Sequence, residues 1–428
     1  MTTQKKLKAL VRARMDKTGE SYTVARRQVL NDQPTDTYQL RGGVSPETAA
    51  LANILASRGI TDPTTGQPIG EALVLGVGGG VGAGYILWEF HDDNRRVVTT
   101  AFRNQWQYPD RWFLKTCERL GVPVTLTETT GEKRAAQQLN QALDAGLPVL
   151  AFVSTVDLPF WHLPEEEAGW IGYTLALYGR HGDRILVDDR NHRRLTMSTD
   201  ATAVARGRIP SYKNRLLVPD AAATELTEEK LVSSVEAALV EQVEHLSSRS
   251  DSFSLPAIGK WVKMLTEPRH SKSWARVFED GDGLLRALVW THESVTEVGI
   301  YGGNLRPLFA EFLVEAARLT GRDLGAANLA YRQAALAWGA FADECLKAPV
   351  VKEVVELDAR RREAVKTGDA GWEEAAAVAA RSNALIRASD IGLDLAGRNQ
   401  LFQDMGAALA EVHIAERAAL AALAGSIS

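Results

Sequence analysis

The residues most suggestive of chemistry form a glycine-rich stretch, 75–85, with the sequence Leu-Gly-Val-Gly-Gly-Gly-Val-Gly-Ala-Gly-Tyr. A backbone with so few side chains lets another group approach it closely. Gly78, Gly80 and Ala83 match a loose dinucleotide-binding fingerprint, which requires a strand before the glycines and a helix after them. Here a helical pattern and a long loop precede the glycines, and an apolar run then ends in a polar turn. This context disfavours a nucleotide site and favours close packing of the glycines against the helix predicted to begin at Ser45.

Thiol and imidazole groups are few in this sequence. Its two cysteines, Cys117 and Cys345, fall in helical patterns, where a small apolar side chain usually packs in the core. His162, in a predicted loop, is either a displaced base or polar surface. The histidines show no metal-ligand spacing. We therefore predict no metal and no other cofactor.

A helix that could position reactive groups begins at Ser45. Ser45 suits the N-cap, Pro46 the first helical position and Glu47 the first turn. Alanines alternate with leucine and isoleucine over 49–56, which leaves small residues on most sides of the helix. A helix of this kind is surrounded by other elements. We expect it in the middle of a domain.

Three segments carry a family resemblance. Residues 42–55, the glycine-rich stretch and 210–217 (Pro-Ser-Tyr-Lys-Asn-Arg-Leu-Leu) resemble the N-terminal domain family of the butirosin biosynthesis protein BtrH. Residues 296–313 resemble the helical domain of unknown function commonly fused to it, and the whole similarity covers 40–350. The resemblance implies a papain-like fold. It also implies an acyltransferase of antibiotic biosynthesis, which moves an acyl group from an acyl carrier protein to an amine.

The implied chemistry uses a cysteine at the start of the central helix, a histidine on a later strand and a carboxylate beyond it. The histidine activates the thiolate, which the helix N-terminus favours. Here the family's His-Cys pair falls on Ser45 and Pro46, Tyr173 stands in place of the histidine, and Asp189 keeps the carboxylate. With one residue inserted, Ser45 takes the cysteine position, so the candidate catalytic residues are Ser45, Tyr173 and Asp189. Tyrosine, with an ordinary pKa near 10, is a poor base at neutral pH.

Aromatic residues crowd the loops that flank the predicted cleft. Together they favour an apolar or aromatic ligand, whereas each one alone favours core packing. Amides alternate with aromatics over 104–109, so this loop is the most site-like. The predicted binding residues are Gly78, Gly79, Gly80, Trp106, Tyr108 and Trp161.

A second glycine-rich turn contains Gly299, Gly302 and Gly303, between two helical patterns. It lacks the Lys-Ser/Thr pair of a phosphate-binding loop. Arg306 beside it is a candidate anion or interdomain contact.

Composition limits the class of protein. A chain of 428 residues with 45% hydrophobic content can bury two ordinary cores. A net charge of -5 gives no global reason to expect nucleic acid or membrane binding. Two cysteines indicate a reducing compartment, and no signal-peptide core or long apolar span is present. We expect a cytoplasmic protein.

The chain divides into three predicted parts. Residues 1–32 form a basic helical segment, 40–219 an α+β domain and 221–428 an all-helical domain. In the second part helices come first and antiparallel strands later, which is typical of a papain-like domain rather than a doubly wound sheet. The alanine-rich last helix is a candidate homodimer surface. The basic segment either binds a nucleic acid or acidic partner, docks on its own chain, or is a solvated appendage.

Three functional hypotheses follow. The first is a pseudoenzyme of secondary metabolism, a binding or scaffolding homologue for an acyl group or acyl carrier protein, because loss of a nucleophile or base costs orders of magnitude in turnover. The second is a divergent acyltransferase that uses Ser45 or merely aligns a thioester with an amine. The third is a DNA-binding sensor that acts through residues 1–30.

Overall fold

The computed structural model describes residues 38–90, 95–164, 172–388 and 391–428, together with Arg12, Arg14, Met15 and Tyr22. Apart from those four residues, the basic segment predicted for 1–32 lies outside the described part of the chain. Within the described residues, no helix combines the length and apolar character needed to cross a membrane.

The first part of the fold is built around two buried helices and a long hairpin. Helix α3 (Pro46–Ser57) and helix α4 (Glu71–Val77) are followed by β1 (Val81–Phe90), which pairs antiparallel with β2 (Arg95–Arg103). Pro46 occupies the first turn of α3, as the sequence predicts, and almost every residue up to Leu55 is buried. Helix α5 (Pro109–Arg119) then leads into the main sheet.

The main sheet has six antiparallel strands in the order β3-β8-β4-β5-β6-β7. Side chains alternate between its two faces, because successive residues of a strand point to opposite sides. Leu150 and Phe152 join the core that contains α3, whereas Val149 and Ala151 join the core on the other face. The strands are β3 (Val124–Thr127), β4 (Val149–Ser154), β5 (Gly172–His181), β6 (Arg184–Asp188), β7 (Leu195–Ser198) and β8 (Leu216–Pro219).

Helices α6 (Glu132–Asp144) and α7 (Thr199–Gly207) contribute to the core on the second face of this sheet. The short 3-10 turns Pro159–Trp161 and Pro210–Tyr212 follow β4 and α7. This arrangement of helices first and antiparallel strands later establishes the α+β class, as predicted.

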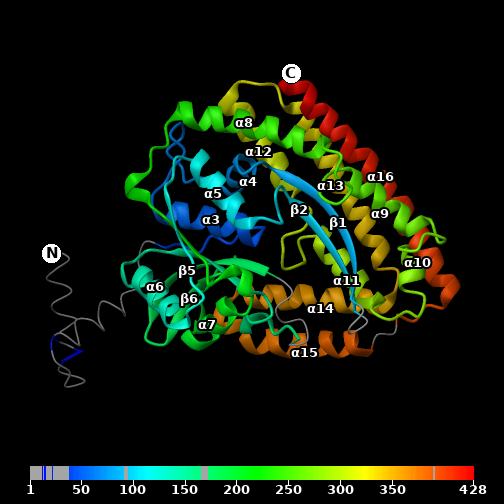
Figure 1. Cartoon of the computed structure of the whole chain (residues 1–428), viewed down its shortest axis with the longest axis horizontal. Helices are drawn as coiled ribbons and strands as arrows, with labels where there is room; N and C mark the ends of the chain where they lie inside the picture. Colours follow the sequence, from blue (N-terminus) through cyan, green and yellow to red (C-terminus); the bar gives the residue numbers. More distant parts are fainter. Residues whose placement is uncertain are drawn as a thin grey trace.

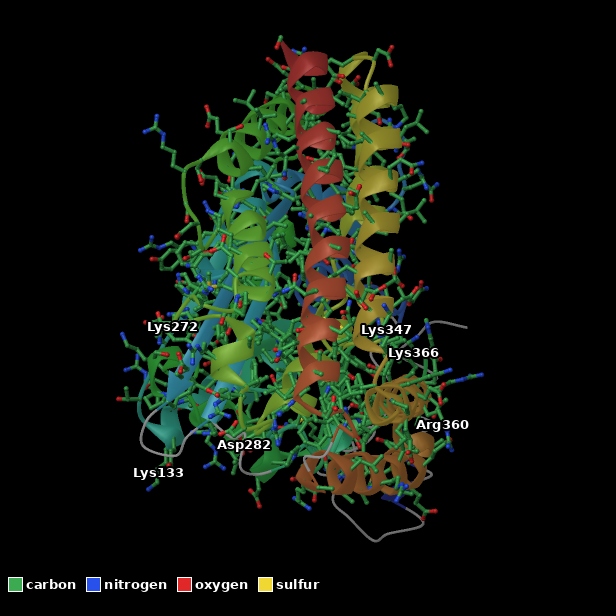
Figure 2. All side chains as sticks on the ribbon, turned by 90° about the vertical axis from the view of Figure 1, so that its right-hand side faces the viewer. Lys133, Lys272, Asp282, Lys347, Arg360 and Lys366 are labelled. Carbon is green, nitrogen blue, oxygen red and sulfur yellow. The ribbon has the colours of Figure 1, made fainter. Side chains whose placement is uncertain are left out.

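Beyond Ala221 the described chain is helical and wraps around the hairpin and α3 (Figure 1). The longest helices, α13 and α16, run side by side along one edge of the molecule (Figures 1 and 2). The α-helices of this part are α8 (Glu228–Ser247), α9 (Pro256–Thr266), α10 (Trp274–Val277), α11 (Leu284–Val295), α12 (Arg306–Thr320), α13 (Gly325–Cys345), α14 (Pro349–Lys366), α15 (Trp372–Ala388) and α16 (Leu395–Ile427).

Apolar packing continues across the boundary predicted at 219–221. Tyr85 of the hairpin stacks on Trp261 of α9, with ring centroids 4.8 Å apart, and Phe102 meets Trp338 of α13 edge-on at 5.0 Å. Such aromatic pairs stabilise a fold beyond the area that they bury. The change from mixed to helical structure at this boundary therefore does not coincide with a gap in the core.

Candidate functional site

The N-terminus of α3 is capped by a carboxylate from α4. Ser45 is the N-cap residue, but its side chain makes no capping bond. Glu71 instead accepts the backbone N–H groups of Val44 and Ser45, both at 2.9 Å, and the Thr48 hydroxyl at 2.6 Å. A carboxylate is favoured there by the unpaired N–H groups and the positive end of the helix dipole. Burial nevertheless raises the pKa of Glu71.

Tyr173, on β5, is committed to two neighbours. Its hydroxyl donates to Asp189 Oδ1 at 2.7 Å and accepts a hydrogen bond from Arg190 Nη2 at 2.6 Å. Burial raises the pKa of Tyr173 well above its ordinary value of 10. The hydroxyl is therefore protonated at neutral pH and already pairs its proton with Asp189.

Asp189 and Arg190 follow the end of β6 and complete a buried polar network. Asp189 Oδ2 accepts the Trp161 indole N–H at 2.9 Å. Arg190 donates to the Val44 carbonyl at 3.1 Å. Burial by itself lowers the pKa of Arg190, but Tyr173 and Asp189 raise it, so the guanidinium stays charged. One side chain thus links Tyr173 to the start of α3.

The geometry brings the three predicted catalytic residues to one place. Arg190 bonds both Tyr173 and the carbonyl of the residue before Ser45. Its backbone has a φ of +62°, which is uncommon for a residue with a side chain and concentrates at special sites. Among the hydrogen bonds of the described residues, however, none joins the Ser45 hydroxyl to Tyr173, Asp189 or Arg190.

A loop from the helical part, 296–304, lies on this network. The Tyr301 ring meets the Tyr173 ring edge-on at 5.5 Å, and its hydroxyl hydrogen-bonds Thr155 at 2.8 Å. Gly302 lies so close to the start of α3 that a Cβ there would be 2.4 Å from the Val44 carbonyl oxygen. The loop therefore covers the site that the sequence predicts.

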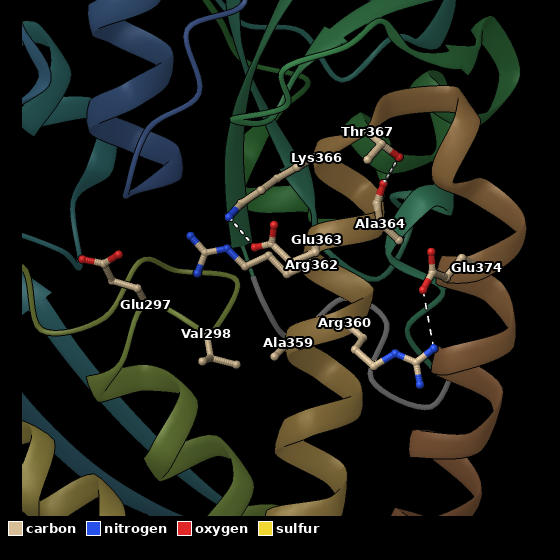
Figure 3. Close-up of a pocket in the computed structure, with 10 residues that line it drawn as sticks. All are labelled: Glu297, Val298, Ala359, Arg360, Arg362, Glu363, Ala364, Lys366, Thr367 and Glu374. Carbon is tan, nitrogen blue, oxygen red and sulfur yellow. Dashed lines mark hydrogen bonds and ion pairs between the residues drawn. The ribbon is translucent and has the colours of Figure 1, made fainter.

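A charged groove of about 560 Å³ borders the outer side of the same loop (Figure 3). Arg362 extends from α14 toward the loop and donates to the Gly299 carbonyl at 3.1 Å. Two further cations pair with carboxylates, Lys366 with Glu363 at 2.6 Å and Arg360 with Glu374 at 3.5 Å. The lining residues are Glu297, Val298, Ala359, Arg360, Arg362, Glu363, Ala364, Lys366, Thr367 and Glu374.

The predicted binding glycines are packed by the protein's own side chains. A Cβ on Gly78 would lie 2.5 Å from the Trp112 ring, and one on Gly80 would lie 2.0 Å from Gln242 Oε1. At Gly79 the close neighbours are Asn104 and Glu241. The turn follows a helix and precedes a strand, the reverse of a dinucleotide-binding motif. Close packing is therefore the observed role, but the nearest neighbours of these glycines come from α5, α8, α12 and Asn104 rather than from the Ser45 helix α3, against which the sequence predicts them to pack.

The predicted aromatic residues divide between two places. Trp161 joins the site through Asp189. Trp106 packs against Phe253, with centroids 5.7 Å apart, and Tyr108 is 48% exposed beneath the Arg111 guanidinium. Among the interactions of the described residues, neither Trp106 nor Tyr108 bonds to the network around Tyr173.

The two thiols pack in the core, as predicted. Burial raises the pKa of Cys117 to about 12 and also raises that of Cys345. A thiol held neutral is a poor nucleophile. In the part of the chain that the structure describes, no cluster of three His, Cys, Asp or Glu side chains forms a metal-binding group.

Sequence reasoning missed Glu71, Arg190 as a bridge, and Tyr301. Arg190 directly follows Asp189, so its proximity could have been anticipated. Tyr301 lies within the segment 296–313 that carries the second resemblance. Its contact with Tyr173 joins residues 128 positions apart, so no local sequence pattern predicts it. Glu71 likewise reaches Ser45 only through the tertiary packing of α4 on α3.

Comparison with known families gives one match. Residues 45–190 match the model described as butirosin biosynthesis protein H, N-terminal. The match begins at the N-cap of α3 and ends at the arginine that bridges the site. No curated protein matches the chain.

Proposed function

We propose, from the premise that residues 45–190 are a domain of the butirosin biosynthesis protein H N-terminal family, that this is a BtrH-like protein of secondary metabolism without acyltransfer chemistry. In this proposal it binds an acyl group or an acyl carrier protein and serves as a scaffold. The papain-like fold and a role in antibiotic biosynthesis are parts of the same proposal.

The observation that carries the proposal is the carboxylate of Glu71 on the N–H of Ser45. Acyl transfer through a tetrahedral intermediate needs N–H donors aimed at a developing oxyanion. An N–H already bonded to a buried carboxylate is occupied, and a negative carboxylate repels a second negative charge. The start of α3 is thus arranged to hold the Glu71 carboxylate of α4 rather than an oxyanion.

Tyr173 supports the same conclusion. A general base must accept a proton near neutral pH, but the pKa of Tyr173 is raised by burial and its oxygen already accepts a bond from Arg190. Since Tyr301 also packs on Tyr173, a bound thioester would have to displace the loop before it reached Ser45.

The charged groove is the proposed contact for the partner. It lies beside the covered site, and its cations Arg360, Arg362 and Lys366 offer positions for the anionic groups of a carrier protein and its phosphate-bearing arm. The carboxylates that now pair with Arg360 and Lys366 are half or more exposed, so they can be exchanged for a ligand.

The test combines turnover with binding. The protein is incubated with acyl carrier protein thioesters and amine acceptors, and products are followed by mass spectrometry. We expect no turnover above background in the wild type and no change in Ser45→Ala. Calorimetry with the carrier protein should give binding that weakens about tenfold in Lys366→Glu, the equivalent of about 1.4 kcal/mol.

Lys352→Glu is the control for the binding test, because Lys352 lies on the same helix, outside the groove, and faces an exposed carboxylate, Glu356, at 4.0 Å. It should leave affinity unchanged. Turnover that disappears in Ser45→Ala would instead support the divergent acyltransferase. Equal losses in both lysine variants would show that the groove has no special role.

A further inference from the structure

The charged groove beside loop 296–304 is lined by one buried cation that no carboxylate pairs. Arg362 is 7% exposed, and its Nη1 donates to the Gly299 carbonyl at 3.1 Å. Among the hydrogen bonds and ion pairs of the described residues, Arg362 makes no other, so its Nε and Nη2 groups have no partner. Burial and the charge of Arg190 lower the pKa of Arg362, but an arginine keeps its charge at neutral pH. Because a buried charge is costly unless it is paired, this guanidinium favours an anionic group in the groove.

The unpartnered groups of Arg362 lie on one edge of the guanidinium. The Nε and Nη2 N–H groups of an arginine point in the same direction and match the two oxygens of a carboxylate. Arg103 binds Glu47 in this way, at 2.5 and 2.9 Å. Since Nη1 of Arg362 holds the Gly299 carbonyl, a carboxylate on the other edge leaves that bond intact. A ligand can therefore bind here without displacing loop 296–304.

Glu297 supplies the opposite charge in the same groove. It is exposed, lines the groove and, among the ion pairs of the described residues, takes part in none. Against the effects of burial and Arg190, the charge of Glu297 raises the pKa of Arg362, so the two charges lie close enough to interact. Figure 3 shows the Arg362 side chain extending toward the loop that carries Glu297. The other four charged residues of the lining are paired with each other.

This pattern of charge distinguishes the possible ligands. A simple anion on Arg362 would also meet the negative charge of Glu297, and a simple cation on Glu297 would meet that of Arg362. A zwitterion satisfies both. Val298 follows Glu297 directly, and Ala359 lies three residues before Arg362 on the same helix, so the lining also offers apolar surface beside both charges (Figure 3).

We propose that the groove binds a free α-amino acid with an apolar side chain, its carboxylate on the free edge of Arg362 and its ammonium group on Glu297. The apolar side chain then packs on Val298 and Ala359. This ligand is bound beside the covered site and needs neither the carrier protein nor any chemistry at Ser45.

The test is calorimetry of the full chain with L-leucine and with two analogues that each lack one charge. Isocaproate has no amino group, and isoamylamine has no carboxylate. We expect leucine to bind with a dissociation constant below about 1 mM, and each analogue to bind at least about tenfold more weakly. Isocaproate or inorganic phosphate that binds as tightly as leucine would show a simple anion site and overturn the proposal.

Two variants separate the two charges. Glu297→Gln should weaken leucine about tenfold without weakening isocaproate, because only the ammonium group loses its partner. Arg362→Lys keeps the positive charge but loses the two-pronged edge, so it should weaken both ligands. Glu311→Gln, an exposed carboxylate of α12 outside the groove, is the control for Glu297→Gln and should change neither affinity.

Circular dichroism of each variant checks that the fold is retained. Wild-type protein that binds no leucine at about 10 mM would overturn the proposal. So would a folded Glu297→Gln variant that binds leucine as tightly as the wild type. Because no carrier protein is present in these titrations, either failure leaves the proposed binding of a carrier protein untouched.

Discussion

Two glycine-rich turns of this protein have different neighbours. The first, 76–80, is surrounded by side chains, and the ideal Cβ of Gly80 falls within 2.6 Å of Gln242 and Phe309. The second, 299–303, is surrounded by backbone, and Gly302 fits against Val44 and Ser45 at the start of α3. Both need glycine because their neighbours leave no room for a Cβ.

The contrast shows what a glycine cluster reveals. It indicates that something approaches the chain closely, but not whether that is a ligand, a side chain or another backbone. The first turn matched a ligand-binding pattern and is filled by the fold. The second matched none, yet it places Tyr301 on the candidate site. Substitutions in the two turns should therefore fail in different ways.

The largest effect is expected for Gly80→Ala in the first turn. Its φ of +72° disfavours any side chain, and the added methyl group would overlap Gln242 Oε1 at 2.0 Å. Backbone strain and overpacking together should lower the free energy of unfolding by about 2–5 kcal/mol. Urea unfolding measures the loss.

Gly146→Ala is the matched control for this change. Gly146 has nearly the same φ, +71°, but no atom lies within 4 Å of its ideal Cβ. It should lose only the backbone contribution, about 1–2 kcal/mol. Equal losses in the two variants would mean that close packing of the first turn contributes nothing.

Gly302→Ala should have a smaller and more local effect. The new methyl group would meet the Val44 carbonyl at 2.4 Å, so the loop 296–304 must move away from α3. We expect a loss of about 2–3 kcal/mol. Hydrogen exchange should quicken at the amides of Val44 and Ser45 and within the loop.

Gly321→Ala is the control for the cost of placing a side chain on a residue with positive φ, since Gly321 has a φ of +70° and no atom lies within 4 Å of its ideal Cβ. It should leave exchange at Ser45 unchanged. If Gly302→Ala also leaves that exchange unchanged, the loop does not cover the start of α3 in solution.

Local patterns predicted much of the fold. The continuous apolar run at 149–153 predicts a buried strand, and the amphipathic pattern that begins at Pro109 predicts a helix over 109–120. The structure has this strand at Val149–Ser154 and this helix at Pro109–Arg119, because both signals are local. Helix α4 and strand β8 were missed. Helix α4 has only seven residues and is bordered by glycines, and β8 is four residues long, so neither carries enough periodicity to detect.

The site was predictable only where the family resemblance supplied it. That resemblance placed Ser45, Tyr173 and Asp189 together, and the network around Arg190 agrees with their proximity. It could not supply Glu71 or Tyr301, since their positions depend on how α4 and the 296–304 loop pack on α3. Which side chains fill this site therefore depends on tertiary packing, and local sequence patterns do not predict it.

Asp188 and Glu241 are carboxyl groups beside the two turns. Their contributions to the free energy of unfolding should change with pH in opposite directions. Burial raises the pKa of Asp188, which holds the Arg190 backbone beneath the second turn, from 3.8 to about 6. The folded state therefore binds this proton more tightly, and stability from this group falls as pH rises from 4 to 6. Relative to Asp188→Asn, the wild type should lose about 1–3 kcal/mol over that interval.

Glu241 beside the first turn should behave in the opposite way. Burial tends to raise its pKa, but Lys115 and Arg119 lower it overall. Its stabilisation is present above its ordinary pKa of 4.5 and is lost as pH falls through the lower folded value. Urea unfolding of Glu241→Gln and Asp188→Asn across pH 4–7 compares the two signs, and slopes of the same sign would contradict the contrast.

The smallest effect is expected for Tyr173→Phe, beneath the second turn. The change removes the hydroxyl between Asp189 and Arg190 but keeps the ring that meets Tyr301. Because Arg190 still pairs with Asp189, at 3.2 Å, and with the Val44 carbonyl, the loss should be only about 1–2 kcal/mol. Tyr108→Phe, with an exposed ring, should change stability by less than about 0.5 kcal/mol in the same urea assay. If Tyr173→Phe leaves the free energy of unfolding unchanged, the Tyr173 hydroxyl adds no stability. Its presence would then need a role in binding or catalysis.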